Sequence, residues 1–443
     1  MTNSYLRFAL ALPLAVLATA LPPATGTSQV SFRVIAVMGQ YQQPAGLAEG
    51  DPEVFYSTGG GYAFSINSRG TTSQLAAFAN GYNLYVMVSA SNGRFYSSLY
   101  AFGGSVVNLF SVSAKPNSAT SYSQQSITAV LTQNLPDGAL LGTGGGQSSG
   151  LFYLVKSDLN GDLTPIYQFP SGEVLPNNAI YATDGNYYGA AWIEHSGGTT
   201  GTSGYIYRVT PSGALTKLYT LPSGTFTTNA SNFVPILQGS DGNLYGATTA
   251  GGANGYGSVY RLTLDGQYTT LYSFAKGPSS YPQSLIQASD GNLFAATLGY
   301  SYTGQISRVT TSGQYTPLHQ MTGSSGQCEC LIIQGSDGII YGTAIQGGGA
   351  GGTVFALDAG LPKPAPKALS FSPAEAAAGT RVRIWGYNML RAAVEFNGVP
   401  AAAVSNSGPN YVWATVPAGA TTGPITVTTP GGTSTTQASF TVR

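Results

Sequence analysis

A short phrase recurs four times in the middle of this chain, and its spacing constrains the fold more than any other feature. Each copy begins with Asp-Gly and runs into an apolar or aromatic stretch. The copies occupy residues 184–189, 241–246, 290–295 and 337–342, and a weaker copy occupies 137–142. Their starts lie roughly 50 residues apart, a period that is typical of propeller blades, in which one supersecondary unit is stacked many times.

Each unit contains two predicted hairpins. Residues 284–288 form one strand, 289–292 a tight turn and 293–297 the returning strand. Asp-Gly favours such a turn because the carboxylate accepts hydrogen bonds from backbone amides, and glycine adopts positive φ without a Cβ clash. A second hairpin is predicted over 258–274. Two hairpins supply four strands, which is the content of one propeller blade.

The number of units predicts the size of the ring. Unit starts fall at Asp51, Asn80, Asp137, Asp184, Asp241, Asp290 and Asp337, which gives about seven blades. Rings of six or eight blades are the alternatives, because the interval between the first two starts, Asp51 and Asn80, is too short by one strand for a complete unit. The last unit offers only two strands, at 339–344 and 353–357, whereas 30–37 reads as a strand without earlier partners. We therefore expect 30–37 to pair into the last blade and close the ring, since an open array would leave those strands unpaired.

The N-terminal 26 residues are predicted to be a signal peptide. Arg7 supplies a positive charge, 8–20 is a short apolar run, and the small residues at 18–20 or 24–26 suit cleavage. No later stretch is long and apolar enough to cross a membrane. The mature chain is therefore expected in the periplasm, at the cell surface or outside the cell. Basic and acidic residues number 17 each, so no basic surface is expected to bind nucleic acid.

Residues 235–274 carry the repeat unit most completely. Asp-Gly-Asn-Leu-Tyr-Gly is followed by a glycine-rich loop, by Gly-x-Val-Tyr-Arg-Leu and by Leu-Tyr-Ser-Phe. This pattern resembles the GloVer tandem repeat of exported bacterial "choice-of-anchor" proteins, over about residues 130–357. The resemblance implies export and a propeller-like repeat, and it supplies no catalytic residue. With the earlier, weaker units included, the repeat domain is predicted to span 27–360.

The periodicity changes after a proline-rich linker at 361–367. Short alternating strands over 368–443 predict a β-sandwich. The stretch resembles an IPT/TIG immunoglobulin-like domain, of a kind that serves mostly as a spacer or adhesive unit in exported proteins. The residues that carry the resemblance are Ser372, Pro373, Gly379, Thr380, Ile384, Trp385, Gly386, Val394, Phe396, Asn397, Gly398, Val416, Pro417 and Phe440.

Catalytic groupings are scarce in this sequence. The two histidines are His195 and His319, and His319 replaces a strand tyrosine of the repeat, so it is expected to be packed. His195 follows Trp192 and Glu194 in a loop between hairpins, and a histidine beside a carboxylate can act as a base. No partnered nucleophile or metal-ligand motif accompanies it. We therefore predict no catalytic residue.

Two segments have spacings that metal ions use. Asp158, Asn160 and Asp162 place oxygens at alternate positions, as calcium loops do, but sister units have plain turns there and no bidentate glutamate follows. An ordinary turn is the favoured interpretation and calcium the alternative; no other cofactor is expected. Cys328 and Cys330 have no partners at zinc spacing, and a disulfide across one residue is strained. They are interpreted as small residues at a strand entrance.

The loops between hairpins vary in length and sequence, so they are the expected binding surface. Tyr256, Tyr300 and Tyr302 lie in such loops, and tyrosine rings can stack on sugars, although tyrosine is also common in strands. With Trp192, Glu194 and His195 they form the candidate ligand-binding set.

Two functional interpretations follow. The leading one is an exported, non-enzymatic repeat protein for adhesion, binding or surface scaffolding, with a polysaccharide or another surface protein as its partner. The alternative is a carbohydrate-active or other propeller enzyme of the periplasm or extracellular space. An enzyme would need acidic residues gathered in one funnel, and Glu194, Asp51 and Glu53 are the ones to test.

Overall fold

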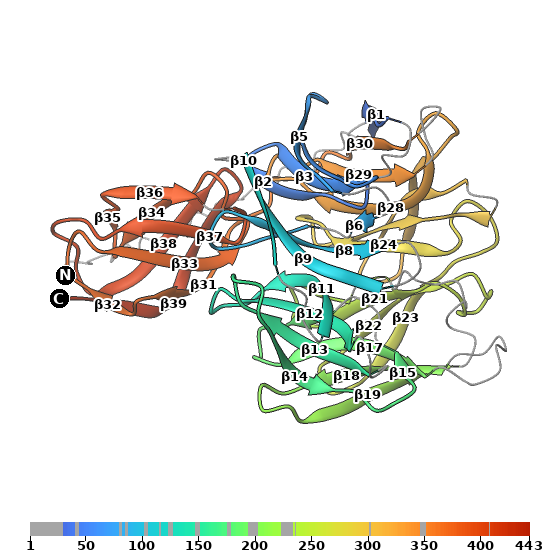
Figure 1. Cartoon of the computed structure of the whole chain (residues 1–443), viewed down its shortest axis with the longest axis horizontal. Coiled ribbons are helices and arrows are strands. Elements are labelled where there is room, and N and C mark those ends of the chain that lie inside the picture. The colour runs from blue at the N-terminus through green and yellow to red at the C-terminus, as the bar shows by residue number, and fades with distance from the viewer. Residues whose placement is uncertain are drawn as a thin grey trace, which may run out of the picture.

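The computed structural model consists of β-strands joined by turns and loops (Figure 1). It describes residues 30–39, 44–78, 82–84, 87–101, 105–114, 117–122, 127–146, 151–174, 179–193, 203–222, 234, 236–300, 303–345, 351–406 and 408–443. Within these ranges, no helix has the length and apolar character needed to cross a membrane.

Seven antiparallel sheets of four or five strands precede the C-terminal residues, and we number them 1 to 7 in chain order. Sheet 1 contains β2 (Ala48–Asp51), β3 (Val54–Gly59), β4 (Tyr62–Asn67) and β5 (Thr72–Ala77); sheet 2 contains β6 (Tyr82–Leu84), β7 (Val88–Ser89), β8 (Phe95–Ala101), β9 (Ser105–Ala114) and β10 (Asn117–Ser121); sheet 3 contains β11 (Ile127–Asn134), β12 (Leu140–Gly146), β13 (Phe152–Ser157) and β14 (Leu163–Gln168). Sheet 4 contains β15 (Glu173–Val174), β16 (Ile180–Tyr181), β17 (Tyr187–Ile193), β18 (Ser203–Val209) and β19 (Leu215–Leu221); sheet 5 contains β20 (Leu237–Gln238), β21 (Leu244–Thr248), β22 (Ser258–Leu262) and β23 (Tyr268–Ser273). Sheet 6 contains β24 (Pro282–Gln287), β25 (Leu293–Thr297), β26 (Gln305–Val309) and β27 (Tyr315–Gln320); sheet 7 contains β28 (Gln327–Gln334), β29 (Ile340–Ile345), β30 (Thr353–Asp358) and β1 (Ser31–Val37).

The last sheet is completed by the first strand of the chain. β1 pairs antiparallel with β30, and Val34 lies opposite Phe355. The predicted pairing of 30–37 into the last unit is therefore confirmed. The strand occupies the edge that the last repeat would otherwise leave open, so the two ends of the repeat array are joined by a ladder of backbone hydrogen bonds.

Each sheet packs against the next, and the last packs against the first. Six buried clusters join consecutive sheets from 1 to 7. A seventh places Phe55 and Phe64 of sheet 1 against Tyr341 and Val354 of sheet 7. A four-stranded sheet has two apolar faces, and this closed arrangement covers both faces of every sheet. The architecture is therefore an all-β ring of the propeller type.

The recurring phrase forms a hydrogen-bonded corner. In the copy at Asp241, Oδ1 accepts the backbone amide of Asn243 at 3.1 Å, and Oδ2 accepts Asn243 Nδ2 at 2.8 Å and the Tyr245 hydroxyl at 2.8 Å. Gly242 between them has φ of 84°. Asp184 forms the same three bonds. The repeated aspartates therefore serve their own hairpins and do not converge on one site.

Antiparallel pairing gives every sheet two distinct edges. The turns between first and second strands, and between third and fourth, lie at one edge, which we call the corner edge because it carries the Asp-Gly phrases. The loops between second and third strands, and the connections to the next sheet, lie at the opposite edge, which we call the loop edge.

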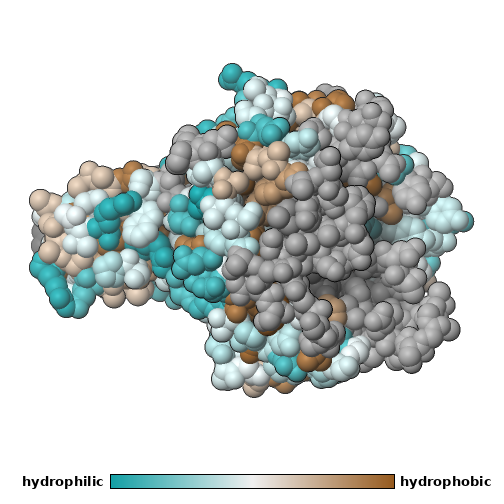
Figure 2. Space-filling model, viewed as in Figure 1, coloured by the Kyte–Doolittle hydropathy of each residue, from teal (hydrophilic) through white to brown (hydrophobic). Residues whose placement is uncertain are grey.

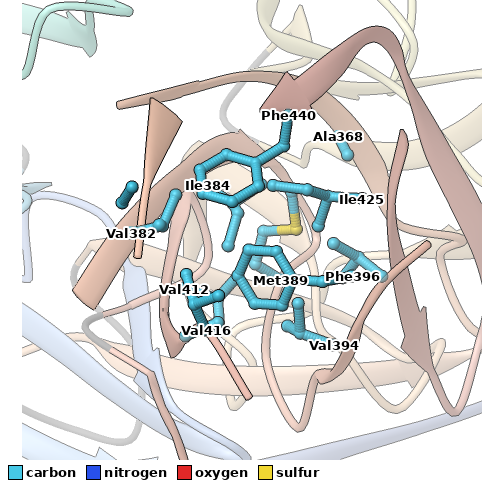
Figure 3. Packing of buried hydrophobic residues seen from close by; sticks show 13 residues of the cluster. Ala368, Val382, Ile384, Met389, Val394, Phe396, Val412, Val416, Ile425 and Phe440 are labelled. Atoms are coloured by element: carbon cyan, nitrogen blue, oxygen red, sulfur yellow. The ribbon is translucent and has the colours of Figure 1, made fainter. Parts of the chain in front are cut away.

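The C-terminal residues form two further sheets around one core. One sheet has the order β31 (Lys367–Ser372), β33 (Arg381–Tyr387), β37 (Tyr411–Thr415) and β36 (Ala403–Asn406); the other has β32 (Glu375–Ala376), β39 (Gly432–Val442), β38 (Gly423–Thr429), β34 (Ala393–Phe396) and β35 (Val399–Pro400). Figure 3 shows Ile384 and Val412 from the first sheet facing Phe396, Ile425 and Phe440 from the second. We call this unit the C-terminal module.

The C-terminal module is docked against the corner edge of the ring. The Tyr411 hydroxyl donates to the carbonyl of Leu135 at 3.3 Å, in the corner between β11 and β12. Arg391 Nη2 lies 3.1 Å from Glu53 Oε1, in the corner between β2 and β3. In the linker, the Pro362 carbonyl accepts a bond from Gln334. Figure 1 shows the module to one side of the seven sheets, and hydrophilic residues gather near the junction in Figure 2.

Candidate functional site

The loop edge carries a group of aromatic residues where sheets 5 and 6 meet. Three segments contribute to it: the loop 249–257 between β21 and β22, the connection 274–281 between β23 and β24, and the start of the loop after β25. All three emerge at the loop edge. The chain enters each sheet at this edge and returns to it after the second and the fourth strand, and each segment follows one of these strands. The module docked on the corner edge leaves this edge clear.

Three tyrosine rings lie together there. The ring of Tyr256 is 5.8 Å from that of Tyr281 and 6.4 Å from that of Tyr300, in edge-to-face arrangements. Lys276 Nζ stands 4.1 Å from the centre of the Tyr300 ring, within the range of a cation–π interaction. Tyr300 is 46% exposed, which is unusual for a large ring in this chain. We call Tyr256, Lys276, Tyr281 and Tyr300 the tyrosine cluster.

Backbone hydrogen bonds hold the three segments of the tyrosine cluster in place. The amide of Tyr281 donates to the carbonyl of Tyr256 at 3.0 Å, and its own carbonyl accepts the amide of Leu298 at 2.9 Å. The amide of Tyr300 donates to the carbonyl of Gly277 at 2.8 Å. Tyr281 has φ of 59°, a conformation that non-glycine residues rarely adopt. Such a conformation persists only where the surroundings over-determine it, and these bonds do so.

The electrostatics of the tyrosine cluster favour neutral phenols beside one cation. Burial raises the pKa of Tyr281, the neighbouring phenols of Tyr256 and Tyr300 raise it further, and Lys276 opposes the shift. The phenol is therefore a hydrogen-bond donor at neutral pH. Lys276 is exposed, and it forms no ion pair with any carboxylate in the described part of the chain. The site presents rings, hydroxyl donors and an uncompensated ammonium group.

The structure brings together part of the predicted ligand-binding set. The rings of Tyr256 and Tyr300 contact each other edge to face, as expected if their two loops form one surface. Glu194, His195 and Tyr302 lie outside the described residues, and Trp192 is described only by its backbone, which pairs with Gly204. The predicted set as a whole therefore stays a prediction.

Sequence reasoning missed Lys276 and Tyr281. Both lie in the connection between sheets 5 and 6, whereas the predicted ligand-binding residues are all assigned to loops between the two hairpins of one unit. The signal was present in the strand count, because a connection after the fourth strand returns to the same edge as the loop after the second.

The acidic residues named for an enzyme do not lie with the tyrosine cluster. Asp51 ends β2, and Glu53 sits in the following corner and pairs with Arg391 of the C-terminal module. Both are therefore at the corner edge, on the opposite end of the ring. Asp51 and Glu53 therefore do not share a site with the tyrosine cluster, because β2 and β3 turn at the corner edge; Glu194 lies outside the described residues, so its part in such a site stays a prediction.

A buried carboxylate in sheet 4 is saturated by its neighbours. Glu173 accepts hydrogen bonds from the Tyr205 hydroxyl and from Lys217 Nζ, the latter at 3.1 Å. Lys217 Nζ also lies 3.9 Å from the centre of the Tyr205 ring. Each carboxylate oxygen has a partner, so the cluster holds β15, β18 and β19 of sheet 4 together, with Tyr205 packed at the seam with sheet 3.

The segment weighed as a calcium loop forms a hydrogen-bonded turn. Asp158 Oδ1 accepts the amides of Asn160 and Asp162, each at 2.9 Å, and Oδ2 accepts Asn160 Nδ2 at 3.2 Å. Across the described ranges, no group of three or more histidine, cysteine or acidic side chains could hold a metal ion. Calcium at Asp158, Asn160 and Asp162 stays a prediction. Cys328 and Cys330 fall within β28, and their side chains lie outside the described residues.

Comparison with solved structures identifies the class of fold. A streptogramin B lyase has a TM-score of 0.53 and 17% identity, over 75% of this chain and 98% of its own. Virginiamycin B lyase from Staphylococcus aureus has a TM-score of 0.52 and 16% identity, over 74% and 99%. A catalytically inactive variant of that lyase, solved with quinupristin, has a TM-score of 0.50 and 16% identity, over 74% and 99%. The chain therefore has an all-β, propeller-like fold.

The repeat itself is matched more narrowly. Residues 175–377 match the Gloeobacter/Verrucomicrobia repeat, which confirms the predicted repeat family over that range. No curated protein sequence matches the chain.

The comparisons overturn the interpretation as a non-enzymatic adhesion or scaffold protein. Solved structures that share this fold across about three quarters of the chain include lyases, so the fold is one that enzymes use. The earlier interpretation rested on the lack of a compact catalytic motif. That argument was wrong because a propeller assembles its site from loops of different sheets, so the reacting groups need not be close in sequence.

Proposed function

We propose that this chain is a carbohydrate-active propeller enzyme of the periplasm or extracellular space, and that its substrate binds at the loop edge. The observation that carries the proposal is the tyrosine cluster, in which three rings and a lysine from successive segments converge on the end of the ring opposite the C-terminal module. The fold shared with lyases supports an enzymatic role.

Sugar recognition suits the chemistry of this cluster. Tyrosine combines an apolar ring, which packs against the C–H face of a pyranose, with a hydroxyl that exchanges hydrogen bonds with sugar hydroxyls. Tyr300 is largely accessible, whereas Tyr281 is held by backbone bonds on either side. A site built from one accessible ring and one fixed ring binds a rigid ligand with little loss of side-chain entropy.

Glu194 and His195 are the proposed reacting groups. They belong to the loop of sheet 4 that is flanked by Ile193 and Ser203, which pair with each other at the loop edge. Sheet 4 packs against sheet 5, which carries Tyr256, so the described strand ends at Ile193 and Ser203 belong to the sheet next to the tyrosine cluster. A carboxylate and an imidazole can act as the general acid and base in cleavage of a glycosidic bond.

The proposal includes the finer architecture. The seven sheets are taken as seven blades closed by β1, the C-terminal module as an IPT/TIG immunoglobulin-like domain, and residues 1–26 as the export signal. In this arrangement the module covers the corner edge and holds the loop edge toward the surroundings. Export is tested by recovering the chain outside the cytoplasm with residue 27 or a close neighbour at its N-terminus.

The enzymatic role is tested by turnover. The exported chain is incubated with a panel of neutral and acidic polysaccharides, and new chain ends are measured. We expect cleavage of at least one, with a loss of 100-fold or more in kcat for Glu194→Gln and for His195→Ala. Glu395→Gln, an exposed glutamate on β34 of the C-terminal module, is the matched control and should keep full activity. A complete lack of turnover across the panel, or full activity in both loop variants, would overturn the proposal.

A further inference from the structure

We infer that the tyrosine cluster recognises an acidic sugar, whose charged group pairs with Lys276 while its ring lies against Tyr300. The inference rests on the proposed function, because it names the substrate class of the same site. It adds the charge of the ligand and the residue that pairs with the charged group.

Charged side chains are scarce in this chain. Charged residues make up only 8% of the sequence, so each lysine on the open end of the ring is a distinct local charge. The described ion pairs involve Lys156, Lys217, Arg391 and Arg443, and none of these is Lys276. Lys276 instead stands over the Tyr300 ring, beside the partly buried Tyr281. Among the described residues, no carboxylate pairs with Lys276 to balance its positive charge.

The lysine is held in place by its segment. The carbonyl of Gly277, the next residue, accepts both the amide of Tyr300 at 2.8 Å and the Ser280 hydroxyl at 2.7 Å. The base of the Lys276 side chain is therefore tied to the same loop as the ring that it covers. A cation–π contact at an exposed site is weak, so a ligand anion can readily draw the ammonium away from the ring.

The surrounding donors suit a singly charged anion. The hydroxyl groups of Tyr256, Tyr281 and Tyr300 can donate hydrogen bonds, and a hydrogen bond to an anion is stronger than one to a neutral acceptor. One ammonium group balances one negative charge, as in the carboxylate of a uronic acid or a sulfate ester. The shared chemistry is an acidic pyranose, and the carboxylate and sulfate sources are separated by experiment.

Binding is measured by titration calorimetry on the whole exported chain, without any need for turnover. The ligands are galacturonate oligomers, galactose oligomers of the same length, and a sulfated galactose oligomer. We expect the acidic oligomers to bind at least tenfold more tightly than the neutral one, with an advantage that shrinks as salt rises. Preference for galacturonate identifies a carboxylate ligand, and preference for the sulfated oligomer identifies a sulfate ligand.

Two variants locate the recognition. Lys276→Gln should remove the preference for acidic oligomers and leave the weak affinity for galactose oligomers unchanged, whereas Tyr300→Ala should weaken both. Lys363→Gln, at an exposed linker lysine, is the matched control and should bind like the unmodified chain. Equal affinity of the Lys276→Gln variant and the unmodified chain for acidic oligomers would overturn the inference.

The outcomes separate this inference from the proposed function. Binding of acidic oligomers that depends on Lys276, in a chain that cleaves no polysaccharide, would support the inference and remove the enzymatic role. Cleavage of neutral polysaccharides that Lys276→Gln leaves untouched would support the enzymatic role and remove the inference.

Discussion

The imidazole of His319 lies flat against the ring of Phe32, with ring centroids 3.6 Å apart and planes inclined by 6°. His319 is on β27, the outer strand of sheet 6, and Phe32 is on β1, the strand that completes sheet 7. The closing strand is thus held by its ladder with β30 and also by a ring from the neighbouring sheet. The Nε2 atom of His319 is buried with no hydrogen-bond partner in the described structure.

This contact predicts that acid weakens the ring. Burial lowers the pKa of His319 below its usual value, so the unfolded chain binds the proton at a higher pH than the folded chain. The contribution of His319 to the free energy of unfolding is therefore complete above about pH 6.5, and it falls as the pH drops toward the pKa of His319 in the folded chain. Thermal unfolding midpoints between about pH 5 and pH 8 measure the effect. His319→Tyr, which restores the residue of sister units such as Tyr272, should flatten that dependence; an unchanged slope would contradict the assignment.

The Asp-Gly corners should contribute unequally to stability. Asp241 holds its hairpin and also accepts the Tyr245 hydroxyl, whereas Asp290 bonds only Asn292 because the fourth residue after it is Phe294. Asp241→Ala is expected to lower the free energy of unfolding by about 1–2 kcal/mol, and Asp290→Ala by about 1 kcal/mol or less. Urea unfolding of both variants measures the difference. Equal losses would show that the tyrosine hydroxyl contributes nothing.

The same corner predicts a loss of stability in acid. Partial burial opposes ionisation of Asp241, but the bonds from Asn243 and Tyr245 outweigh it and hold the pKa of Asp241 below its usual range. Its contribution is therefore present above about pH 4 and is lost as the pH falls through the lowered pKa. The unfolding difference between Asp241→Asn and the unmodified chain should shrink below about pH 3, and a constant difference would contradict this account.

The glycine that ends the recurring phrase makes room for a ring. A Cβ at Gly246 would lie 2.3 Å from the Tyr260 hydroxyl oxygen, on the paired residue of β22. At the equivalent positions of sheet 6, Ala295 pairs with Ser307. The residue in place of the glycine is larger there, and the residue in place of the tyrosine is smaller. Gly246→Ala should therefore cost about 1–3 kcal/mol of stability by overpacking.

A double-mutant cycle tests the pairing of Gly246 with Tyr260. Gly246→Ala should cost less in a Tyr260→Ser background than in the unmodified chain, because the clash partner is gone. Strictly additive losses in urea unfolding would contradict the steric explanation. Gly323→Ala, where a Cβ would meet nothing within 4 Å, is the matched control and should cost little.

Docking of the C-terminal module should depend more on Tyr411 than on Arg391. Tyr411 is 1% exposed and its hydroxyl reaches the Leu135 carbonyl, whereas Arg391 and Glu53 form an exposed ion pair. Tyr411→Phe is expected to cost about 1 kcal/mol of docking free energy, and Arg391→Ala less than about 0.5 kcal/mol. Hydrogen exchange at residues 133–139, together with proteolysis of the linker, measures undocking. Greater undocking in Arg391→Ala would reverse the ranking.

Much of the fold could be predicted from the sequence because the interactions that specify each hairpin join residues close together in the chain. The Asp241 carboxylate bonds residues two and four positions later, so the phrase specifies its corner wherever it occurs. The closure by β1 also followed from strand counting, since the last unit lacked a partner that 30–37 could supply. The pairing of Val34 with Phe355 agrees with that count.

The candidate site was predicted only in part. Tyr256 and Tyr300 were placed on a rim because both lie in loops between hairpins. Lys276 and Tyr281 were missed, and the sequence did not indicate that Asp51 and Glu53 lie at the corner edge, away from the tyrosine cluster. The reason is that membership of a site depends on which edge a segment reaches, and that depends on the strand count and on the packing of neighbouring sheets.

The sequence by itself determined the repeated hairpin, its Asp-Gly corner and the number of strands that needed partners, because these follow from contacts among residues close in the chain. Only the tertiary structure decided that Tyr256, Tyr281 and Tyr300 share one surface and that the C-terminal module docks at the other end. Those choices depend on burying apolar faces between sheets that are distant in sequence, and no local pattern encodes which loops that burial brings together.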